Sequence, residues 1–255
     1  MKCCKNVHSY LIQKGLLSNA TKNIMSFYDN DNSSLYSGFD PTAKTLHIGH
    51  LMAIASMNAF AAHGYQTIYL VGGATAMLGD PSDKAKTRPL LPPQQIESNS
   101  LKITQQIQNI NKNISKSEDF KSLLNLTKTN YKEPIYCNNV DFYKNTKILD
   151  FYRNIGTNFK SNVMISKDWV KSRLSEEEGI TYSEFAYSLF QSHDYLMLHQ
   201  LYSCSLQIGG SDQWSNICFG IDYVKKILNK EVHGLTVPLL LDSKGKKLSK
   251  TEVIK

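Results

Sequence analysis

The sequence contains no long run of apolar residues. Its apolar stretches, of which 237–241 is typical, are far shorter than the ~20 residues that a bilayer-spanning helix needs. No signal-type apolar segment with a small-residue cleavage site opens the chain. These absences argue against a helical membrane protein, and we expect no membrane among its partners.

Paired cysteines are also missing. The five cysteines form no C-x-x-C pair, and their odd number argues against a disulfide framework. We therefore expect free thiols in a reducing compartment. This compartment is the cytoplasm or, as an alternative, a mitochondrion or plastid-type organelle of a eukaryote with an AT-rich genome, which would suit the Asn-Lys bias of stretches such as 109–113. Residues 1–14 are too short and mixed to be identified as a transit peptide.

The chain does have enough apolar material for a full core. With 255 residues, 41% of them hydrophobic, it can form one large domain or a domain with a small appendage. Lysine and arginine outnumber aspartate and glutamate, 29 against 22, and the net charge of +7 favours an anionic substrate or a polyanionic partner. This charge alone is weak evidence, because many basic proteins bind nothing anionic.

Strand and helix patterns alternate along the chain, without an internal repeat. Residues 35–40 predict a strand, 46–63 a helix ended by Gly64, and 67–71 a second strand, which together predict a parallel βαβ unit. Further elements are expected in this order: a helix from 92–93, a polar and partly mobile connection over 111–132, a strand over 135–140, helices over 146–154 and 163–174, a strand over 205–208, a helix over 213–228 and a strand over 235–241. The alternation predicts an α/β fold with a doubly wound sheet.

One predicted helix, over 181–201, carries polar residues at a regular spacing. The pattern Thr181-Tyr182-Ser183-Glu184 is a capping box and predicts where this helix begins. Tyr187, Gln191 and Asp194 follow at i, i+4 and i+7 within an otherwise apolar and aromatic segment, so they share one helix face. This face is a candidate binding site for an amino acid.

Two histidines stand three residues apart where the helix after the first strand is expected to begin. A helix N-terminus attracts anions, and the imidazoles of His47 and His50 can donate to phosphate oxygens. Gly49 between them lets a ligand approach the backbone. The alternative is a pair of capping or surface histidines, or half of a zinc site. No cysteine lies nearby to complete such a site, and we predict no metal ligands.

A lysine-rich motif, Lys247-Leu248-Ser249-Lys250-Thr251, follows a turn-like cationic stretch near the end of the sequence. Two lysines three residues apart, with hydroxyls beside them, suit a triphosphate whose negative charge builds up during transfer at the α-phosphate. A solvated lysine loop is the more common interpretation of such a run. This motif alone does not decide between the two.

Taken together, the His47-Ile48-Gly49-His50 and Lys247–Thr251 motifs resemble the paired H-I-G-H and K-M-S-K-S motifs of class I aminoacyl-tRNA synthetases, with Leu248 and Thr251 as departures. Further segments, in family order, are similar to tyrosyl-tRNA synthetases of the bacterial and organellar type. They are Tyr36-x-Gly38-Phe39-Asp40-Pro41-Thr42, Gly79-Asp80-Pro81-Ser82, Tyr187-x-x-x-Gln191-x-x-Asp194 and 207–214. The resemblance implies a Rossmann-like parallel sheet and a two-step reaction with ATP, Mg²⁺, L-tyrosine and tRNA(Tyr).

The resemblance also implies roles for individual residues. Tyr36 and Asp194 would contact the substrate phenol, since a phenol can donate to a carboxylate and accept from a hydroxyl. Without that phenol a buried Asp194 would lack a donor, so phenylalanine should be rejected strongly. The remaining tyrosine-binding residues would be Asp80, Tyr187 and Gln191 at the ammonium and Gln207 near the substrate.

On the nucleotide side the implied residues fall into three groups. Those facing the ATP phosphates or taking part in catalysis are Thr42, His47, His50, Lys247, Lys250 and Thr251. Those contacting the nucleoside or the adenylate are Gly38, Asp40, Gly49, Gly209, Asp212 and Gln213, together with Lys247 and Lys250. Lys84 and Arg88 are candidates for pyrophosphate or the acceptor end of tRNA, although an exposed basic loop is nearly as good an interpretation and Asp83 weakens the assignment.

The expected organisation follows the same resemblance. It comprises an N-terminal helical segment over 1–34 and a catalytic domain over 35–255, with a helical insertion at about 90–160. The part of that insertion over 141–159 resembles the segment that joins two subunits, so we expect a homodimer. Family members continue past the lysine motif into an anticodon-binding region, which this sequence lacks. We therefore expect a truncated piece that forms the adenylate yet charges tRNA poorly.

Three other functions stay open on the sequence. A tryptophanyl-tRNA synthetase shares the architecture, although Tyr36 and Asp194 argue against it. A general nucleotidyltransferase also uses an H-x-G-H loop but would not need the polar face with Tyr187, Gln191 and Asp194. A non-catalytic RNA-binding protein on a synthetase scaffold would bind RNA tightly without forming an adenylate.

Overall fold

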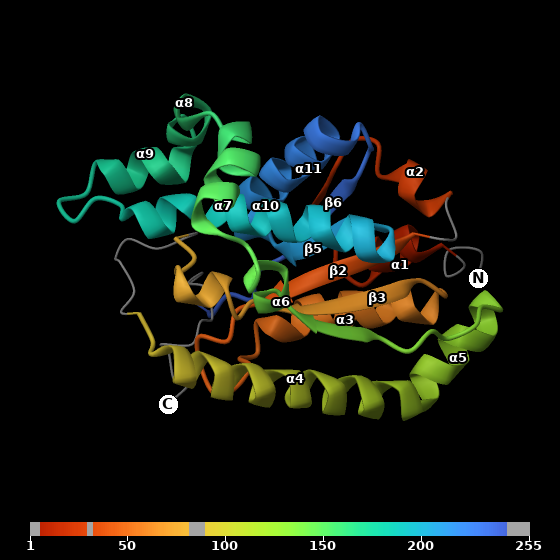
Figure 1. The fold of residues 1–255 in the computed structure, drawn as a ribbon. Helices are drawn as coiled ribbons and strands as arrows, with labels where there is room; N and C mark the ends of the chain where they lie inside the picture. Colours follow the sequence, from red (N-terminus) through yellow and green to blue (C-terminus); the bar gives the residue numbers. More distant parts are fainter. Residues whose placement is uncertain (1–5, 30–32, 82–89, 244–255) are drawn as a thin grey trace.

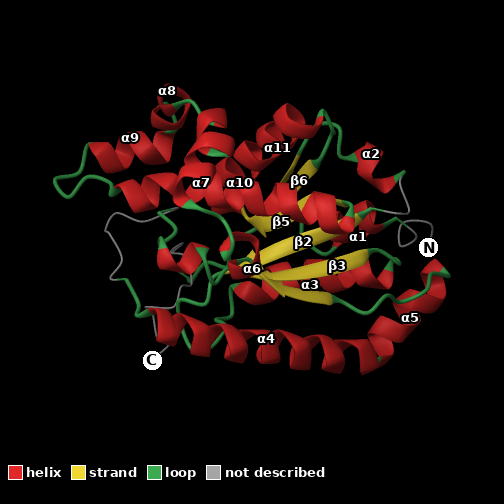
Figure 2. Cartoon of the chain, in the orientation of Figure 1, coloured by secondary structure: helices red, strands yellow, loops and turns green. Residues whose placement is uncertain are grey.

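The fold is a sheet covered by helices on both faces (Figures 1 and 2). The computed structural model describes residues 6–29, 33–81 and 90–243. The strands in this part of the chain are β1 (Asn19–Ala20), β2 (Ser34–Phe39), β3 (Gln66–Val71), β4 (Ile135–Asn138), β5 (Cys204–Gly210) and β6 (His233–Val237). The helices are α1 (Val7–Gln13), α2 (Met25–Tyr28), α3 (His50–Ala62), α4 (Pro93–Lys116), α5 (Glu118–Thr127), α6 (Val140–Tyr143), α7 (Ile148–Asn154), α8 (Ser161–Ile165), α9 (Asp168–Leu174), α10 (Tyr182–Tyr202) and α11 (Trp214–Leu228), with short 3₁₀ turns η2 (Thr75–Met77), η3 (Gly156–Asn158) and η4 (Ser211–Gln213).

The strand order places a topological switch in the middle of the sheet. The described strands are arranged β1-β6-β5-β2-β3-β4, and all neighbours are parallel except β1, which pairs antiparallel with β6. From the centre of the sheet, β2 and β3 follow one another toward one edge, and β5 and β6 follow one another toward the other edge. In such sheets ligands bind outside the carboxyl ends of the strands, at the switch between β2 and β5. The predicted doubly wound α/β fold is confirmed.

The two faces of the sheet have separate cores. Leu35 and Phe39 of β2 pack with α3 in one cluster, whereas Tyr36 between them belongs to the cluster that contains α10 and α11 residues. This alternation follows from the two-residue period of a strand. Tyr36 and Gln207 are register partners across β2 and β5, so both side chains face the α10 layer. The sheet thus turns both toward the helix with the predicted polar face.

The first βαβ unit forms where the sequence predicted it, except for the start of its helix. α3 begins at His50, four residues after the predicted start at Leu46. The reason lies in the preceding turn, where Gly49 N–H donates to His47 Nδ1 at 3.1 Å and His47 N–H donates to His50 Nδ1 at 3.2 Å. These side-chain contacts replace helical bonds, so His47 precedes the helix.

The polar stretch over 111–132 is more regular than predicted. α4 continues to Lys116, and α5 then starts with Ser117 as N-cap, whose side chain accepts from Phe120 N–H. Two buried residues anchor these helices: Asn111, which accepts from Asn58 and Tyr69, and Phe120, which stacks edge-on with Tyr131. Most of the stretch predicted as a polar and partly mobile connection is therefore helical.

Two other predicted elements are shorter in the structure. The single helix expected over 163–174 is divided into α8 and α9, because Lys167 between them has extended backbone and serves as the N-cap of α9. β6 ends at Val237 rather than at Leu241. Pro238 follows directly, and proline has no N–H to donate to a neighbouring strand.

The N-terminal segment and the predicted insertion each contain a strand of the main sheet. β1 lies between α1 and α2 and pairs with β6. β4, inside the 90–160 range for which we predicted a helical insertion, pairs with β3. The predicted boundaries of the N-terminal segment, the catalytic domain and its insertion remain a proposal. Of the helices in the described residues, none is both long and apolar enough to cross a membrane.

Candidate active site at the switch point

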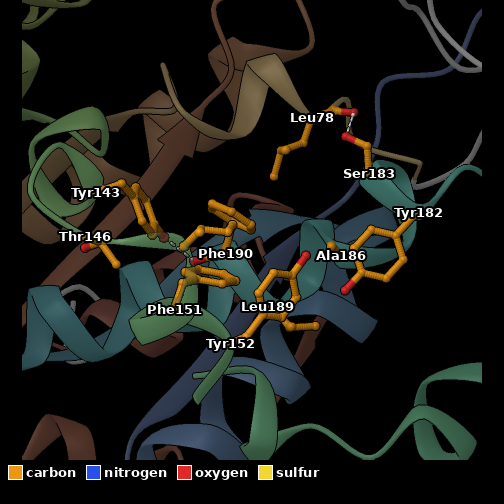
Figure 3. Close-up of a pocket in the computed structure, with 11 residues that line it drawn as sticks. Leu78, Tyr143, Thr146, Phe151, Tyr152, Tyr182, Ser183, Ala186, Leu189 and Phe190 are labelled. Carbon is orange, nitrogen blue, oxygen red and sulfur yellow. Dashed lines mark hydrogen bonds between the residues drawn. The ribbon is translucent and has the colours of Figure 1, made fainter. Parts of the chain in front are cut away.

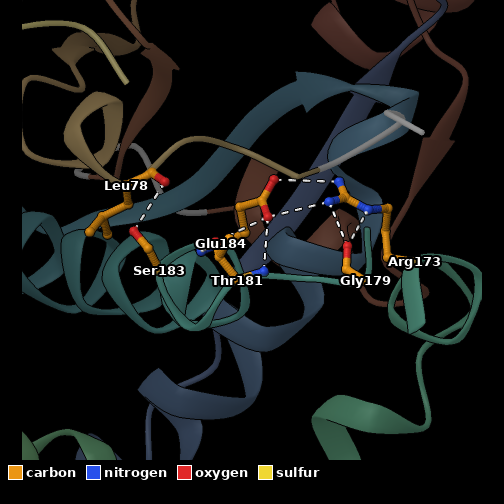
Figure 4. Close-up of polar contacts among 6 residues, drawn as sticks. All are labelled: Leu78, Arg173, Gly179, Thr181, Ser183 and Glu184. Carbon is orange, nitrogen blue, oxygen red and sulfur yellow. Dashed lines mark hydrogen bonds and ion pairs between the residues drawn. The ribbon is translucent and has the colours of Figure 1, made fainter. Parts of the chain in front are cut away.

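The start of α10 is held by a buried ion pair and a complete capping box (Figure 4). Thr181 accepts from Glu184 N–H, and Glu184 accepts in return from Thr181 N–H, as predicted. Arg173 of α9, 2% exposed, reaches the same carboxylate at 3.3 Å. Ser183 also donates to the carbonyl of Leu78 at 3.1 Å. These contacts fix the register of α10 relative to η2 and therefore where its polar face points.

Tyr187 on that face joins α10 to the end of β2. Its hydroxyl donates to Asp40 Oδ2 at 2.9 Å, and Thr75 donates to Asp40 Oδ1 at 2.7 Å. Burial raises the pKa of the Tyr187 hydroxyl well above its ordinary value, and the carboxylates of Asp40 and Asp80 add to the effect. Tyr187 therefore remains a neutral donor between two carboxylates.

Asp194, two helical turns beyond Tyr187 on the same face, is buried and hydrogen-bonded. Asn139 donates to Oδ2 at 2.9 Å and Tyr143 donates to Oδ1 at 2.6 Å. Burial raises the pKa of the carboxyl from 3.8 to about 7, although both donors oppose this shift. The expectation that Asp194 lacks a donor in the absence of substrate was wrong. A carboxylate offers about four acceptor positions, so these two donors leave room for a third.

Five buried polar atoms of β2, β5 and α10 have no hydrogen-bond partner within the described part of the chain. They are the Tyr36 hydroxyl, Gln191 Oε1, Gln207 Oε1, Ser188 Oγ and His193 Nδ1. Burial raises the pKa of the Tyr36 hydroxyl well above its ordinary value, and the charge of nearby Asp194 adds to this effect. Each buried unsatisfied group costs roughly 1–3 kcal/mol. Such a concentration of unsatisfied atoms is what a site for a polar ligand requires.

Asp80 and Gln213 meet at the other end of the same region. Gln213 Nε2 donates to Asp80 Oδ2 at 2.8 Å, which brings the loop after η2 to the turn after β5. The resemblance assigned these two residues to different substrates, one to the ammonium and the other to the nucleotide. Their contact indicates that the two halves of the site are adjacent.

The histidines lie at the N-terminal end of α3, with stacked rings whose centroids are 3.7 Å apart. Nδ1 of each ring accepts a backbone N–H, His47 from Gly49 and His50 from His47. A neutral ring with Nδ1 as acceptor carries its proton on Nε2. Both imidazoles can therefore present an Nε2–H donor to an anion, beside the positive end of a helix dipole.

The remaining predicted residues lie at the carboxyl ends of β2 and β5. Thr42 N–H donates to the Asp40 carbonyl at 2.8 Å, which forms the turn before the histidines. Gly38 is exposed, and a Cβ there would meet nothing within 4 Å. A Cβ on Gly209 would approach Gln213 Cβ at 2.9 Å, and the Asp212 carboxylate lies close over Gly210. An open Gly38 thus lies beside a crowded glycine turn at the end of β5, as expected where a ligand approaches backbone.

Some predicted residues lie outside the described part of the chain. These are Lys84, Arg88, Lys247, Lys250 and Thr251. Among the residues that are described, no group of three or more histidine, cysteine, aspartate or glutamate side chains could hold a metal ion.

Three polar residues of the site were missed by the sequence prediction. Asn139 and Thr75 follow the carboxyl ends of β4 and β3, where the rule for parallel sheets could have identified them. Asn139 accepts from Ala74 N–H at 2.7 Å, which turns its amide N–H₂ toward Asp194. Tyr143 ends a four-residue helix and has no local signal. Its contact with Asp194 depends on how α6 packs against α10.

Comparisons with known proteins agree with this geometry. The family model for tRNA synthetases of class I (W and Y) matches residues 28–253. Tyrosine–tRNA ligase 1 of Photorhabdus laumondii is 42% identical over 220 residues, covering 86% of this chain and 49% of that relative. Tyrosine–tRNA ligase of Buchnera aphidicola is 43% identical over 220 residues, with 86% and 49% coverage.

A solved structure extends the comparison to the fold. A C-terminally truncated mitochondrial tyrosyl-tRNA synthetase of Aspergillus nidulans superposes with a TM-score of 0.83 at 27% identity, covering 96% of this chain and 72% of that one. The chain spans about half the length of the curated relatives it matches. Because the family model covers most of the sequence, the chain belongs to the tRNA synthetases of class I (W and Y).

Proposed function

We propose that this chain is the catalytic region of a tyrosine–tRNA ligase (EC 6.1.1.1). In the first step a carboxylate oxygen of L-tyrosine bonds to the α-phosphorus of ATP and pyrophosphate leaves, which gives tyrosyl-adenylate. In the second step a ribose hydroxyl at the 3′ end of tRNA(Tyr) takes the tyrosyl group and AMP leaves. Relatives that carry this name match most of the sequence, which supports the proposal.

The observation that carries the proposal is the hydroxyl of Tyr36, which lies near Asp194 and has no hydrogen-bond partner among the described residues. A phenol accepts from one hydroxyl and donates to one carboxylate, so a substrate tyrosine satisfies both residues at once. Tryptophan has only a donor N–H, and phenylalanine has neither group. Neither side chain can accept from the Tyr36 hydroxyl, so its hydrogen would stay unsatisfied, at a cost of roughly 1–3 kcal/mol.

The other end of the amino acid carries an ammonium group. We assign its recognition to Asp80, Tyr187 and Gln191, with Gln207 near the substrate. Gln191 Oε1, which has no hydrogen-bond partner in the described part of the chain, is a suitable acceptor. The nearby carboxylates of Asp40 and Asp80 favour a cation. α10 thus carries groups for both ends of tyrosine, separated by two helical turns.

The ATP side is assigned to residues around the histidine turn. Nε2–H groups of His47 and His50, with Thr42 and the end of α3, stabilise negative charge on the phosphates as it develops. No covalent enzyme nucleophile is required, so catalysis consists of positioning and electrostatic stabilisation. From sequence resemblance, Lys247, Lys250 and Thr251 act on the phosphates, Gly38, Asp40, Gly49, Gly209, Asp212 and Gln213 contact the nucleoside or adenylate, and Lys84 and Arg88 contact pyrophosphate or the tRNA acceptor end.

Mg²⁺ belongs to the same proposal as a companion of ATP. The described carboxylates nearest the site already accept hydrogen bonds, Asp40 from Tyr187 and Thr75, and Asp80 from Gln213. Among the described residues, no group of three or more histidine, cysteine, aspartate or glutamate side chains could form a cage of protein ligands. We therefore assign the ion to the ATP phosphates, whose charge it would offset, as is usual for Mg²⁺.

Amino-acid-dependent exchange of pyrophosphate with ATP tests the first step. The chain should exchange pyrophosphate with tyrosine and do so far more slowly with phenylalanine or tryptophan. Exchange driven best by tryptophan would assign the chain to the other enzyme of the family. Absence of exchange with any amino acid, together with tight RNA binding, would favour a non-catalytic role.

We also propose that the protein acts as a homodimer through the face around α7 and the start of α10. This interface patch consists of Ile148, Leu149, Tyr152 and Tyr182, which are 67%, 77%, 43% and 62% exposed. Ile148, Tyr152 and Tyr182 also line an apolar cavity of about 380 Å³ (Figure 3). Three of these residues, Ile148, Leu149 and Tyr152, lie within 141–159, whose sequence resembles the subunit contact of the family. A second copy of the chain is therefore the proposed occupant.

Sedimentation velocity of the Leu149→Glu variant tests the dimer. A charge in the patch should convert dimer to monomer, because a buried unpaired carboxylate is costly. Leu101→Glu is the matched control, since Leu101 is 71% exposed on α4 and lies outside the patch. A monomeric wild type, or equal behaviour of both variants, would contradict the proposed interface.

For localisation we propose the cytoplasm, with an organelle as the alternative. The bacterial relatives support the first and the mitochondrial structure from Aspergillus nidulans is consistent with the second.

A further inference from the structure

Tyr143 connects the wall of the apolar cavity to the carboxylate of Asp194. Its ring packs against Phe190 with centroids 4.9 Å apart and lies 5.7 Å from the ring of His193. Its hydroxyl lies 2.6 Å from Asp194 Oδ1. The same hydroxyl lies 3.0 Å from the carbonyl of Phe190 (Figure 3). The ring of Tyr143 therefore lines the apolar cavity, and its hydroxyl reaches the candidate active site at Asp194.

A hydroxyl has one hydrogen, so Tyr143 can donate to only one of these two acceptors at a time. When Asp194 is ionised, the short charge-assisted bond to Oδ1 is favoured. When Asp194 is protonated, it can donate to the Tyr143 oxygen, while Tyr143 donates to Phe190. Only the first arrangement leaves Asp194 as a pure acceptor for a further donor.

The geometry points to Tyr143 as a positioning residue that determines specificity: its hydroxyl holds Asp194 as an ionised acceptor, oriented to receive the substrate phenol. This inference rests on the proposed tyrosine activation. Asn139 holds Oδ2 from the opposite side, so the two donors together fix the plane of the carboxylate. Tyr143 does not itself need to touch the substrate.

The surroundings of Asp194 make its ionisation dependent on such donors. The ionisable groups that act on it are Tyr36 from β2, Cys137 from β4, Asp40 after β2 and Tyr187 from α10. His193 from α10 lies beside the ring of Tyr143. Burial raises the pKa of Cys137 to about 12 and lowers that of His193 to about 4, so both stay neutral near pH 7. None of these neighbours supplies a positive charge near pH 7.

The test compares wild type with Tyr143→Phe, which keeps the ring and removes only the hydroxyl. A ¹³C NMR titration of aspartate carboxyls, with Asp194→Asn to assign the signal, should show the Asp194 midpoint about one pH unit higher in Tyr143→Phe. In pyrophosphate exchange at pH 7, the KM for tyrosine should rise about 10-fold with little change in kcat, and raising the pH should restore it.

Tyr131→Phe is the matched control. Tyr131 is a partly buried tyrosine whose ring packs against Phe120, outside both the site and the interface patch, and its hydroxyl has no hydrogen bond with Asp194 in the described structure. An unchanged Asp194 midpoint in Tyr143→Phe, or equal effects of the two variants on tyrosine KM, would overturn the inference. If the Asp194 midpoint shifts in Tyr143→Phe but the wild type shows no tyrosine-dependent exchange, the proposed function would be overturned. The coupling between Tyr143 and Asp194 would then still hold.

Discussion

The hydroxyl of Tyr187 donates to Asp40 Oδ2 across 2.9 Å and so ties the centre of α10 to the carboxyl end of β2. This bond crosses the switch point of the sheet, where the substrates of such folds bind. It links a residue assigned to the amino acid with one assigned to the nucleotide.

Tyr187→Phe should therefore weaken both the fold and amino-acid binding. Loss of a hydrogen bond to a carboxylate should lower the free energy of unfolding by about 1.5–3 kcal/mol. The KM for tyrosine in pyrophosphate exchange should rise about 10-fold because one ammonium ligand is lost. Tyr195→Phe is the control: its hydroxyl donates to the His233 carbonyl at 2.7 Å, so stability should fall while KM stays the same. Equal KM effects in both variants would contradict the assignment.

Two glycines near Asp40 should respond oppositely to alanine. A methyl group on Gly72 would overlap the Asp40 carboxylate and the Thr75 hydroxyl, whereas one on Gly38 would meet nothing within 4 Å. Gly72→Ala should cost about 1–3 kcal/mol in unfolding by urea. Gly38→Ala should keep wild-type stability yet raise the KM for ATP. An unaltered KM in Gly38→Ala would remove Gly38 from the nucleotide site.

The role of His47 can be separated from its structural contact. Nδ1 accepts from Gly49 N–H at 3.1 Å, and the side-chain oxygen of an asparagine could replace that acceptor but not the Nε2–H donor. His47→Asn should therefore fold normally and lower the rate of adenylate formation by about 10²-fold, with tyrosine affinity unchanged. Stopped-flow fluorescence measures both quantities. Equal losses in rate and affinity would contradict phosphate stabilisation by this ring.

The buried carboxyl of Asp194 should make stability depend on pH. Because its pKa is raised from 3.8 to about 7 in the folded state, its stabilising contribution is complete below about pH 4 and is lost as pH rises through 7. Asp194→Asn removes this loss. The free energy of unfolding of the variant, relative to that of wild type, should therefore rise between pH 4 and 8, by at most about 4 kcal/mol.

Urea unfolding of both proteins at several pH values checks this prediction. His193, whose pKa burial lowers to about 4, is present in both and cancels in the difference. A difference in unfolding free energy that is constant with pH would show that Asp194 does not titrate in this range.

Local patterns were sufficient to predict the βαβ unit, the capping box of α10 and the shared face of Tyr187, Gln191 and Asp194. These features depend on residues close in sequence. The contacts of Asp194 with Tyr143 and Asn139, 51 and 55 residues away, depend on how α6 and β4 pack beside α10. No periodicity records such packing, so the sequence led us to expect an Asp194 without donors.

The start of α3 shows a different limit. The residues over 46–50 are compatible with helix. The helix nevertheless begins only at His50, because the side chains of His47 and His50 accept backbone N–H groups. Side chains that bond to nearby backbone compete with helix formation. Such competition is decided by geometry that propensities do not contain.

The most direct test of the account is the ratio of kcat/KM for tyrosine over phenylalanine in pyrophosphate exchange, compared between wild type and Asp194→Asn. If Asp194 and Tyr36 read the phenol, the ratio should fall at least 10-fold in a variant that remains folded, chiefly through a loss of tyrosine activity. An unchanged ratio, with tyrosine activity intact, would contradict the assignment of the α10 face to tyrosine.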